Sequence, residues 1–340
     1  MNYLKILKII GISFLLLIGL LFPYFASSWG FFGHKKINQL AVFTLPEEMF
    51  GFYKKHIRFL TENAVKPDSR RYVVKGEAPR HYIDADAKAY GDSAIYKMPR
   101  YWKEAVEKFT EDTLMTYGIV PWHIQVMKYR LTEAFKERKP ALILTLSAEI
   151  GHYIADANVP LHTTENYNGQ LTNQLGIHGF WESRLPELYS QDYDFFVGKA
   201  EFIKNTQLRA WDAVIQANEA LDSVFRFEKE LTEKMGEDKK WTFDERNGIL
   251  IKTYSRDFSK AYHTMLKGQV ERRMRASVKM VGDFWYTCWV EAGQPDLNSM
   301  MDFEFSPEDL AKEKEEMLSI RDSLKNIRTH DNFGDGSTNK

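Results

Sequence analysis

Apolar residues recur at intervals of three and four along much of the chain beyond residue 100. Such stripes fall within residues 102–109, 124–135 and 270–288, and each predicts an amphipathic helix with one face toward a core. The run 141–157 is apolar on almost every side and follows Pro140, a residue suited to the first turn of a helix. We therefore expect a helix buried all round. No run of alternating apolar and polar residues predicts a strand, so the pattern indicates an all-α fold.

No linker falls within residues 29–301, and no solenoid-type repeat recurs. This predicts a single helical domain over 29–305. The sequence Ser-Pro-Glu-Asp at 306–309 is typical of a helix start and leads into a Lys/Glu-rich stretch, which predicts a charged C-terminal helix over 306–329. The polar remainder, 330–340, predicts a disordered tail.

The first 28 residues have the outline of a signal peptide. Lys5 and Lys8 precede a stretch without charge from 9 to 28, and the small residues Ala26 and Ser28 stand where signal peptidase reads the chain. Cleavage after residue 28 would make Trp29 the first residue of an exported protein, periplasmic or secreted. The alternative is a retained anchor, because about twenty uncharged residues can span a bilayer.

Composition narrows the class of protein. Hydrophobic residues make up 44% of the chain, aromatic residues 14% and charged residues 27%, which favours a globular protein with a sizeable core over a disordered one. The net charge of -1 excludes a strong overall positive field for nucleic acid, and loss of the two lysines of residues 1–28, a segment without acids, would make it -3. The single cysteine, Cys288, excludes an intramolecular disulfide, so packing or metal must hold the fold.

Histidines and acids then fall at spacings that place them on a common face. His152 and Asp156 are four residues apart on the buried helix, His162 follows beyond Pro160, and His178 and Glu182 repeat the four-residue spacing. Imidazole and carboxylate together suit zinc. One such pair is more often a salt bridge, but two pairs and a third histidine within 31 residues predict a metal site.

Two further segments make the pattern specific. Residues 29–34 read Trp-Gly-Phe-Phe-Gly-His, and beyond them Asp68 precedes Arg71 by three residues, as His81 precedes Asp84. With the histidines above, the chain resembles the zinc-dependent phospholipase C / S1-P1 nuclease superfamily, which comprises secreted all-helical enzymes with three zinc ions.

The resemblance implies nine metal ligands, of which Trp29 would use its terminal amine and carbonyl oxygen. Trp29 and His34 would hold one zinc with Asp156 as a bridging carboxylate. Asp156 would also serve the second zinc, and the third would have an open position. The ligands are Trp29, His34 and Asp156 for the first, Asp68, His81, His152 and Asp156 for the second, and His162, His178 and Glu182 for the third.

The resemblance also implies roles beside the metal. Asp68 would orient or deprotonate the attacking water, Arg71 would grip a phosphate oxygen, and Asp84 would fix the arginine. Arg70 competes with its neighbour for that role, and the alternative for Arg71 with Asp84 is an ordinary salt bridge. Tyr82 would line the cleft and bind substrate, or else pack in the core.

The branch of the superfamily stays open. Arg71 and Asp84 are nuclease-like, whereas Glu182 as last ligand is nearer the bacterial phospholipases C, and Ala155 and Val159 replace a glycine and a glutamine usual in both. We expect a zinc-dependent phosphodiesterase of the phospholipase C type, in transient contact with a membrane and without a stable protein partner. The alternatives are a nuclease acting on single-stranded nucleic acid or 3′-nucleotides, and a non-catalytic, zinc-stabilised protein anchored in a membrane.

Overall fold

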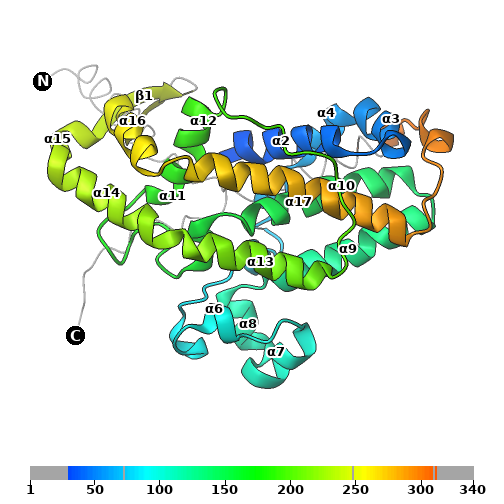
Figure 1. The fold of residues 1–340 in the computed structure, drawn as a ribbon, viewed down its shortest axis with the longest axis horizontal. Helices are drawn as coiled ribbons and strands as arrows, with labels where there is room; N and C mark the ends of the chain where they lie inside the picture. The colour runs from blue at the N-terminus through cyan, green and yellow to red at the C-terminus, as the bar shows by residue number, and fades with distance from the viewer. Residues whose placement is uncertain (1–29, 72, 247–248, 309–310, 312–340) are drawn as a thin grey trace, which may run out of the picture.

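The computed structural model describes residues 30–71, 73–246, 249–308 and 311, and these are mostly helical (Figure 1). The expected signal peptide, Trp29, the disordered tail and nearly all of the C-terminal helix expected at 306–329 lie outside this part of the chain. Within it, no helix is both long and apolar enough to cross a membrane.

Helices dominate the order of elements. The α-helices are α2 (Gly30–Ala41), α3 (Glu47–Lys55), α4 (Ile57–Asn63), α5 (Lys66–Arg70), α6 (Ala94–Lys97), α7 (Trp102–Phe109), α8 (Glu111–Tyr117), α9 (Val120–Lys136), α10 (Pro140–Asp156), α11 (Ile177–Gly179), α12 (Leu185–Tyr189), α13 (Thr206–Glu219), α14 (Leu221–Met235), α15 (Glu237–Lys240), α16 (Arg256–Met265) and α17 (Gln269–Glu291). The 3-10 turns are η1 (Val42–Thr44), η2 (Ala78–His81), η3 (Lys88–Tyr90), η4 (Pro160–Thr163) and η6 (Asn298–Met300), and η5 (Phe180–Arg184) is a π-helix.

The helices expected from the apolar stripes are present. Residues 102–109 form α7, and the stripes at 124–135 and 270–288 lie within α9 and α17. The apolar run after Pro140 forms α10, which packs against α2, α4, α9 and α17. This surrounding of α10 on several sides explains why its sequence is apolar nearly all round.

The main helices form one body around α10 and α17. Figure 1 shows α17 running lengthwise through the molecule, with α13 along one side and α2 on the other, while α6, α7 and α8 project at the bottom of the view. Buried side chains from all these layers belong to one hydrophobic cluster. Phe303 and Phe305 extend it by packing on α3 and α4, where the rings of Phe59 and Phe305 stack with centroids 4.3 Å apart.

The expectation of no strand is wrong. Strands β1 (Trp241–Arg246) and β2 (Ile249–Tyr254) form an antiparallel pair with Trp241 opposite Tyr254 and Arg246 opposite Ile249. Asn-Gly at 247–248 is a strong hairpin signal in the sequence, but the two strands lack a consistent alternation, because Phe243 and Leu250 are apolar and yet exposed. Trp241 and Tyr254 pack against each other, with ring centroids 4.5 Å apart.

Gly151 lets α10 approach α2 closely. A Cβ atom there would lie 2.0 Å from Asn38 Oδ1, and Asn38 cannot yield easily because its Nδ2 donates to the carbonyl oxygens of Ala148 and Leu60. We expect Gly151→Ala to lower the free energy of unfolding by about 1 to 3 kcal/mol, measured by urea titration. Gly179→Ala is the matched control, because nothing lies within 4 Å of a Cβ there. Equal stability of the two variants would contradict the close packing.

Candidate metal centre

Seven elements bring buried imidazole and carboxylate groups into one cluster. Every member is at most 8% exposed, so these groups must be satisfied by one another or by a ligand rather than by bulk water. In chain order they are His34 on α2, Asp68 on α5, His81 on η2, His152 and Asp156 on α10, His162 on η4, His178 on α11 and Glu182 on η5.

Helical spacing aligns two of the pairs. His152 and Asp156 lie one turn apart in the last turns of α10, with His152 Nε2 3.1 Å from Asp156 Oδ2. His178 and Glu182 have the same separation in sequence and form an ion pair, even though the backbone passes from α11 into the wider π-helix η5. The i,i+4 geometry expected from the sequence therefore holds at both places.

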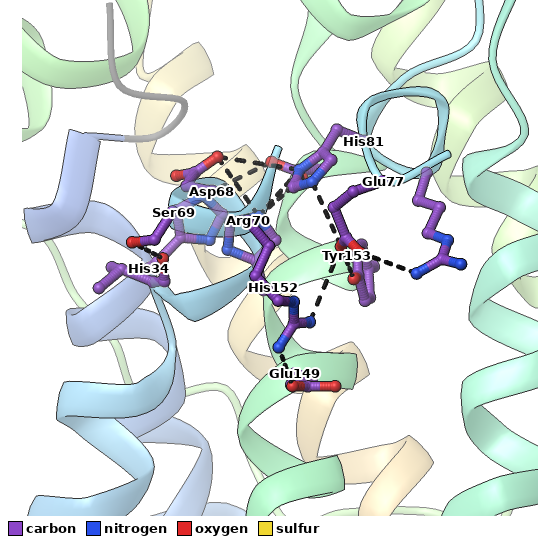
Figure 2. A network of polar contacts seen from close by, with 12 residues as sticks. His34, Asp68, Ser69, Arg70, Glu77, His81, Glu149, His152 and Tyr153 are labelled. Carbon is purple, nitrogen blue, oxygen red and sulfur yellow. Dashed lines mark hydrogen bonds and ion pairs between the residues drawn. The ribbon is translucent and has the colours of Figure 1, made fainter. Parts of the chain in front are cut away.

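Four atoms that could bind a metal ion surround one point beside His152. His81 Nδ1 lies 3.0 Å from His152 Nε2 and 2.9 Å from Asp156 Oδ2, and Asp68 Oδ1 lies 3.8 Å and 3.6 Å from the two imidazole nitrogens (Figure 2). Ligands bound at about 2.0 to 2.1 Å to a tetrahedral zinc ion are about 3.3 Å apart. The separations of these four atoms therefore scatter around the edge of a zinc tetrahedron.

Asp156 connects this group to two others. Its Oδ2 faces His81 and His152, whereas its Oδ1 lies 3.5 Å from both His34 Nε2 and His162 Nδ1. The other nitrogen of His162, Nε2, lies 3.1 Å from His178 Nε2. Three groups of donor atoms, each within 4.8 Å of one another, result: His34, His152 and Asp156; Asp68, His81 and His152; and His162, His178 and Glu182.

Buried atoms without hydrogen-bond partners show that the protein alone does not satisfy the cluster. Both ring nitrogens of His34, Oδ2 of Asp68 and Oε1 of Glu182 have none. Such atoms are costly to bury unless a ligand completes them. Two pairs of imidazole nitrogens also meet at 3.0 and 3.1 Å, where their lone pairs would repel without a proton or a cation between them. The residues present fit a divalent cation with nitrogen and oxygen ligands.

The protonation states of the clustered residues also suit the binding of a cation. Burial, with the charge of His152, lowers the pKa of His34, and burial, with His178 and Arg71, holds the pKa of His162 well below its ordinary value. Both rings are therefore neutral near neutral pH, with one unprotonated nitrogen each. Burial opposes ionisation of Asp156, but the positive charge of His152 holds its pKa well below the usual range, so it remains a carboxylate.

His152 shows how strongly the carboxylates attract positive charge. Burial alone would lower its pKa, yet Asp156 and Asp68 raise the pKa to about 9. A proton on His152 thus fills the position between the acids that a cation would take. His152 Nδ1 lies 2.8 Å from the carbonyl oxygen of Ala64, an acceptor that fixes the ring and leaves Nε2 facing the group.

Arg71, Tyr82 and Asp84 lie together beside the third group. The Arg71 guanidinium is 6.0 Å from the centroid of the Tyr82 ring, and its charge lowers the pKa of both His162 and Asp84. Against that influence, burial first and then Asp86 and Glu165 raise the pKa of Asp84 to about 7. Arg71 thus lowers the pKa of His162, a candidate metal ligand, and of Asp84, the carboxylate expected to hold Arg71 in place.

Arg70 is occupied elsewhere. Its Nη1 lies 2.5 Å from Glu149 Oε1 and its Nη2 lies 3.7 Å from Glu77 Oε1, with the side chain 15% exposed (Figure 2). An arginine held in two buried ion pairs is not available to a substrate. Arg71, its neighbour in sequence, instead lies beside Tyr82 and acts on His162.

Several residues near the cluster were not anticipated. Glu77 and Tyr153 contact each other beside His81, and the Tyr167 ring lies 5.8 Å from that of His178 while 42% exposed. Glu77 precedes His81 by four residues, the same spacing that identified the His/Asp pair on α10, so that signal was available. No comparable signal marked Tyr167.

Gly30, the residue after the predicted ligand Trp29, lies close to the cluster. A Cβ atom on Gly30 would lie 2.7 Å from the Oγ atom of Ser183, the residue that follows Glu182.

Comparison with known proteins adds no further identification. No family model matches the chain, and no curated protein matches it. What the cluster can do is therefore inferred from its own residues.

Asp84 gives a test of the electrostatics. Its pKa of about 7 exceeds the ordinary value, so the folded protein keeps a proton that the unfolded chain releases, and stability falls as pH rises from about 4 to about 7. Asp84→Asn should remove this loss. We expect the decline in free energy of unfolding between pH 5 and pH 8 to be about 2 kcal/mol smaller in Asp84→Asn than in wild type, after allowing for partial exposure. Urea titrations in a chelator measure this.

The control for that experiment is Asp92→Asn, because Asp92 is exposed. Its decline in stability should match that of wild type. If Asp84→Asn also declines as wild type does, Asp84 is not perturbed in the way its surroundings indicate.

Proposed function

We propose that this protein is a zinc-dependent hydrolase of phosphate esters, a phosphodiesterase of the phospholipase C type that uses three zinc ions. The observation that supports this most is the position of Asp156, whose two oxygens face four histidines belonging to three groups of buried donors. Shared carboxylates of this kind suit a multinuclear site. The neighbouring Arg71 supplies the cation that a phosphate needs beside such a site.

The three groups of donor atoms support the following assignment of ligands. His34 with Asp156, joined by the N-terminus of Trp29, would hold the first zinc, with His152 close by. Asp68, His81 and His152 would hold the second together with Asp156, whose Oδ2 faces both histidines, and His162, His178 and Glu182 would hold the third. Bound zinc supplies Lewis acidity, because it lowers the pKa of water toward 7 and offsets negative charge on a phosphate.

The chain's own side chains supply positioning and proton handling. Asp68 directs Oδ1 toward His81 and His152, while its Oδ2 is buried without a hydrogen-bond partner and is the oxygen that would take a proton from the attacking water. Arg71 would pair its guanidinium with a phosphate oxygen. Asp84, once ionised, would hold that guanidinium in place.

A nuclease is the second candidate, for a specific reason. Tyr82 lies under the Arg71 guanidinium, and the partly exposed ring of Tyr167 lies against His178. Aromatic rings beside a cation are what a stacked base requires. We keep phospholipid as the first substrate class because the chain has no excess of positive charge with which to attract nucleic acid.

Metal content tests the cluster. We expect about three zinc ions per chain by mass spectrometry of the purified protein, with Trp29 as the first residue of an exported, processed form. His152→Ala should lose more zinc than His178→Ala, because His152 belongs to two groups and His178 to one. His263→Ala should retain it all, since His263 bonds to Tyr193 outside these groups. Fewer than one zinc per wild-type chain would contradict the proposal.

Activity tests the reaction. The protein should hydrolyse phosphatidylcholine or single-stranded DNA, and a chelator should abolish the activity. Arg71→Met should lower kcat about 100-fold with unchanged zinc content, because one stabilising contact to the phosphate is lost. The exposed Arg58 provides the control, and Arg58→Met should retain full activity. Full zinc without turnover of either substrate would favour a non-catalytic role.

A further inference from the structure

Glu77 is a buried carboxylate behind the second group of donors. It lies at the start of η2, four residues before His81, and is 1% exposed. Its Oε1 lies 3.8 Å from His81 Nε2, the ring nitrogen that faces away from Asp156 and His152 (Figure 2). Glu77 and the donor cluster therefore lie on opposite sides of one imidazole ring.

A tyrosine hydroxyl and two arginine side chains hold the Glu77 carboxylate in this position. Tyr153 donates its hydroxyl to Glu77 Oε1, and Arg80 Nη1 lies 2.7 Å from Oε2. Arg70 contacts the same carboxylate and bridges it to Glu149 on α10. Two carboxylates and two guanidinium groups thus balance their charges, which is what buried ions require.

The arginines and the tyrosine also keep Glu77 ionised. The Tyr153 hydroxyl and the guanidinium groups of Arg70 and Arg80 face its two oxygens, and donors and positive charge in these positions favour the charged form of a carboxylate. A carboxylate that is always charged is a permanent hydrogen-bond acceptor.

We propose that Glu77 is a positioning residue, which keeps the proton of His81 on Nε2 so that Nδ1 presents its lone pair to the group formed with Asp68, His152 and Asp156. This inference rests on the proposed metal site. A neutral imidazole carries one proton, and the acceptor beside one nitrogen decides that the other is free to bind. The 3.8 Å separation between Glu77 Oε1 and His81 Nε2 is longer than a hydrogen bond, so Glu77 acts on the Nε2 proton through its charge.

The network also fixes His81 relative to α10. Tyr153 directly follows His152, and its ring lies edge-on to both His81 and His152, with centroids 5.4 and 5.5 Å apart. Glu149 lies one turn earlier on the same helix and holds Arg70. The helix that carries two ligands thus also carries the contacts that orient a third.

Zinc affinity provides the test. We expect Glu77→Gln to bind one zinc about 10- to 100-fold more weakly than wild type in competition with a chelator, while still reaching the wild-type content at saturating zinc. Glu149→Gln is the matched control. It removes a buried carboxylate from the same network without touching His81, so its affinity should stay near that of wild type. Far-UV circular dichroism establishes that both variants fold.

If Glu77→Gln does not fold, Tyr153→Phe takes its place, since it removes one donor to Glu77 and leaves all charges. Its zinc affinity should fall. Unchanged affinity in the folded Glu77 variant or its substitute would overturn the inference, as would an equal loss in Glu149→Gln.

A second measurement separates this inference from the proposed function. In metal-free protein labelled with ¹⁵N at histidine, Glu77 beside Nε2 and Asp156 beside Nδ1 compete for the proton of His81, so Glu77→Gln should lower the share of the Nε2-protonated tautomer below that of the wild type. If wild-type protein binds no zinc, the proposed function fails, and this spectrum alone decides the role of Glu77. An unchanged tautomer ratio in Glu77→Gln would overturn that role.

Discussion

The buried carboxylate of Asp156 is the constraint on which the site depends. It is fully buried and ionised, and such a group is stable only when positive charge or hydrogen-bond donors surround it. Four histidines from α2, η2, α10 and η4 face its two oxygens. Segments far apart in the sequence thus meet at one group, and the cost of burying it is offset only when all of them are in place.

The fold supplies the rigidity that this arrangement needs. α10 carries Asp156 and is enclosed by four other helices, with Gly151 allowing the near approach of α2 and Ser147 bonded to Tyr53 and Trp285. Ligands on packed helices hold their geometry better than ligands on loops. The second layer, in which Ala64 orients His152 and Glu77 faces His81, extends the same control to individual rings.

Much of the helical fold and of the histidine and carboxylate cluster could be predicted from the sequence, for physical reasons. Helical periodicity places His152 next to Asp156 whatever the rest of the chain does, and a run as apolar as α10 must be buried. The β1–β2 hairpin was missed because its strands are short and the apolar Phe243 and Leu250 are exposed to solvent, which breaks a consistent period of two. Tyr167 lies against His178 only because the connection from η4 folds back there, a consequence of tertiary packing that local pattern does not encode. The ion pair of Arg70 with Glu149, a residue 79 positions away, likewise depends on tertiary packing.

The most direct measurement is anomalous X-ray diffraction at the zinc edge from crystals of the zinc-equilibrated protein. The account predicts strong anomalous peaks among the donors around Asp156, one of them enclosed by Asp68, His81, His152 and Asp156. Crystals grown in zinc that show no anomalous peak within this cluster, or peaks only at surface side chains, would contradict it.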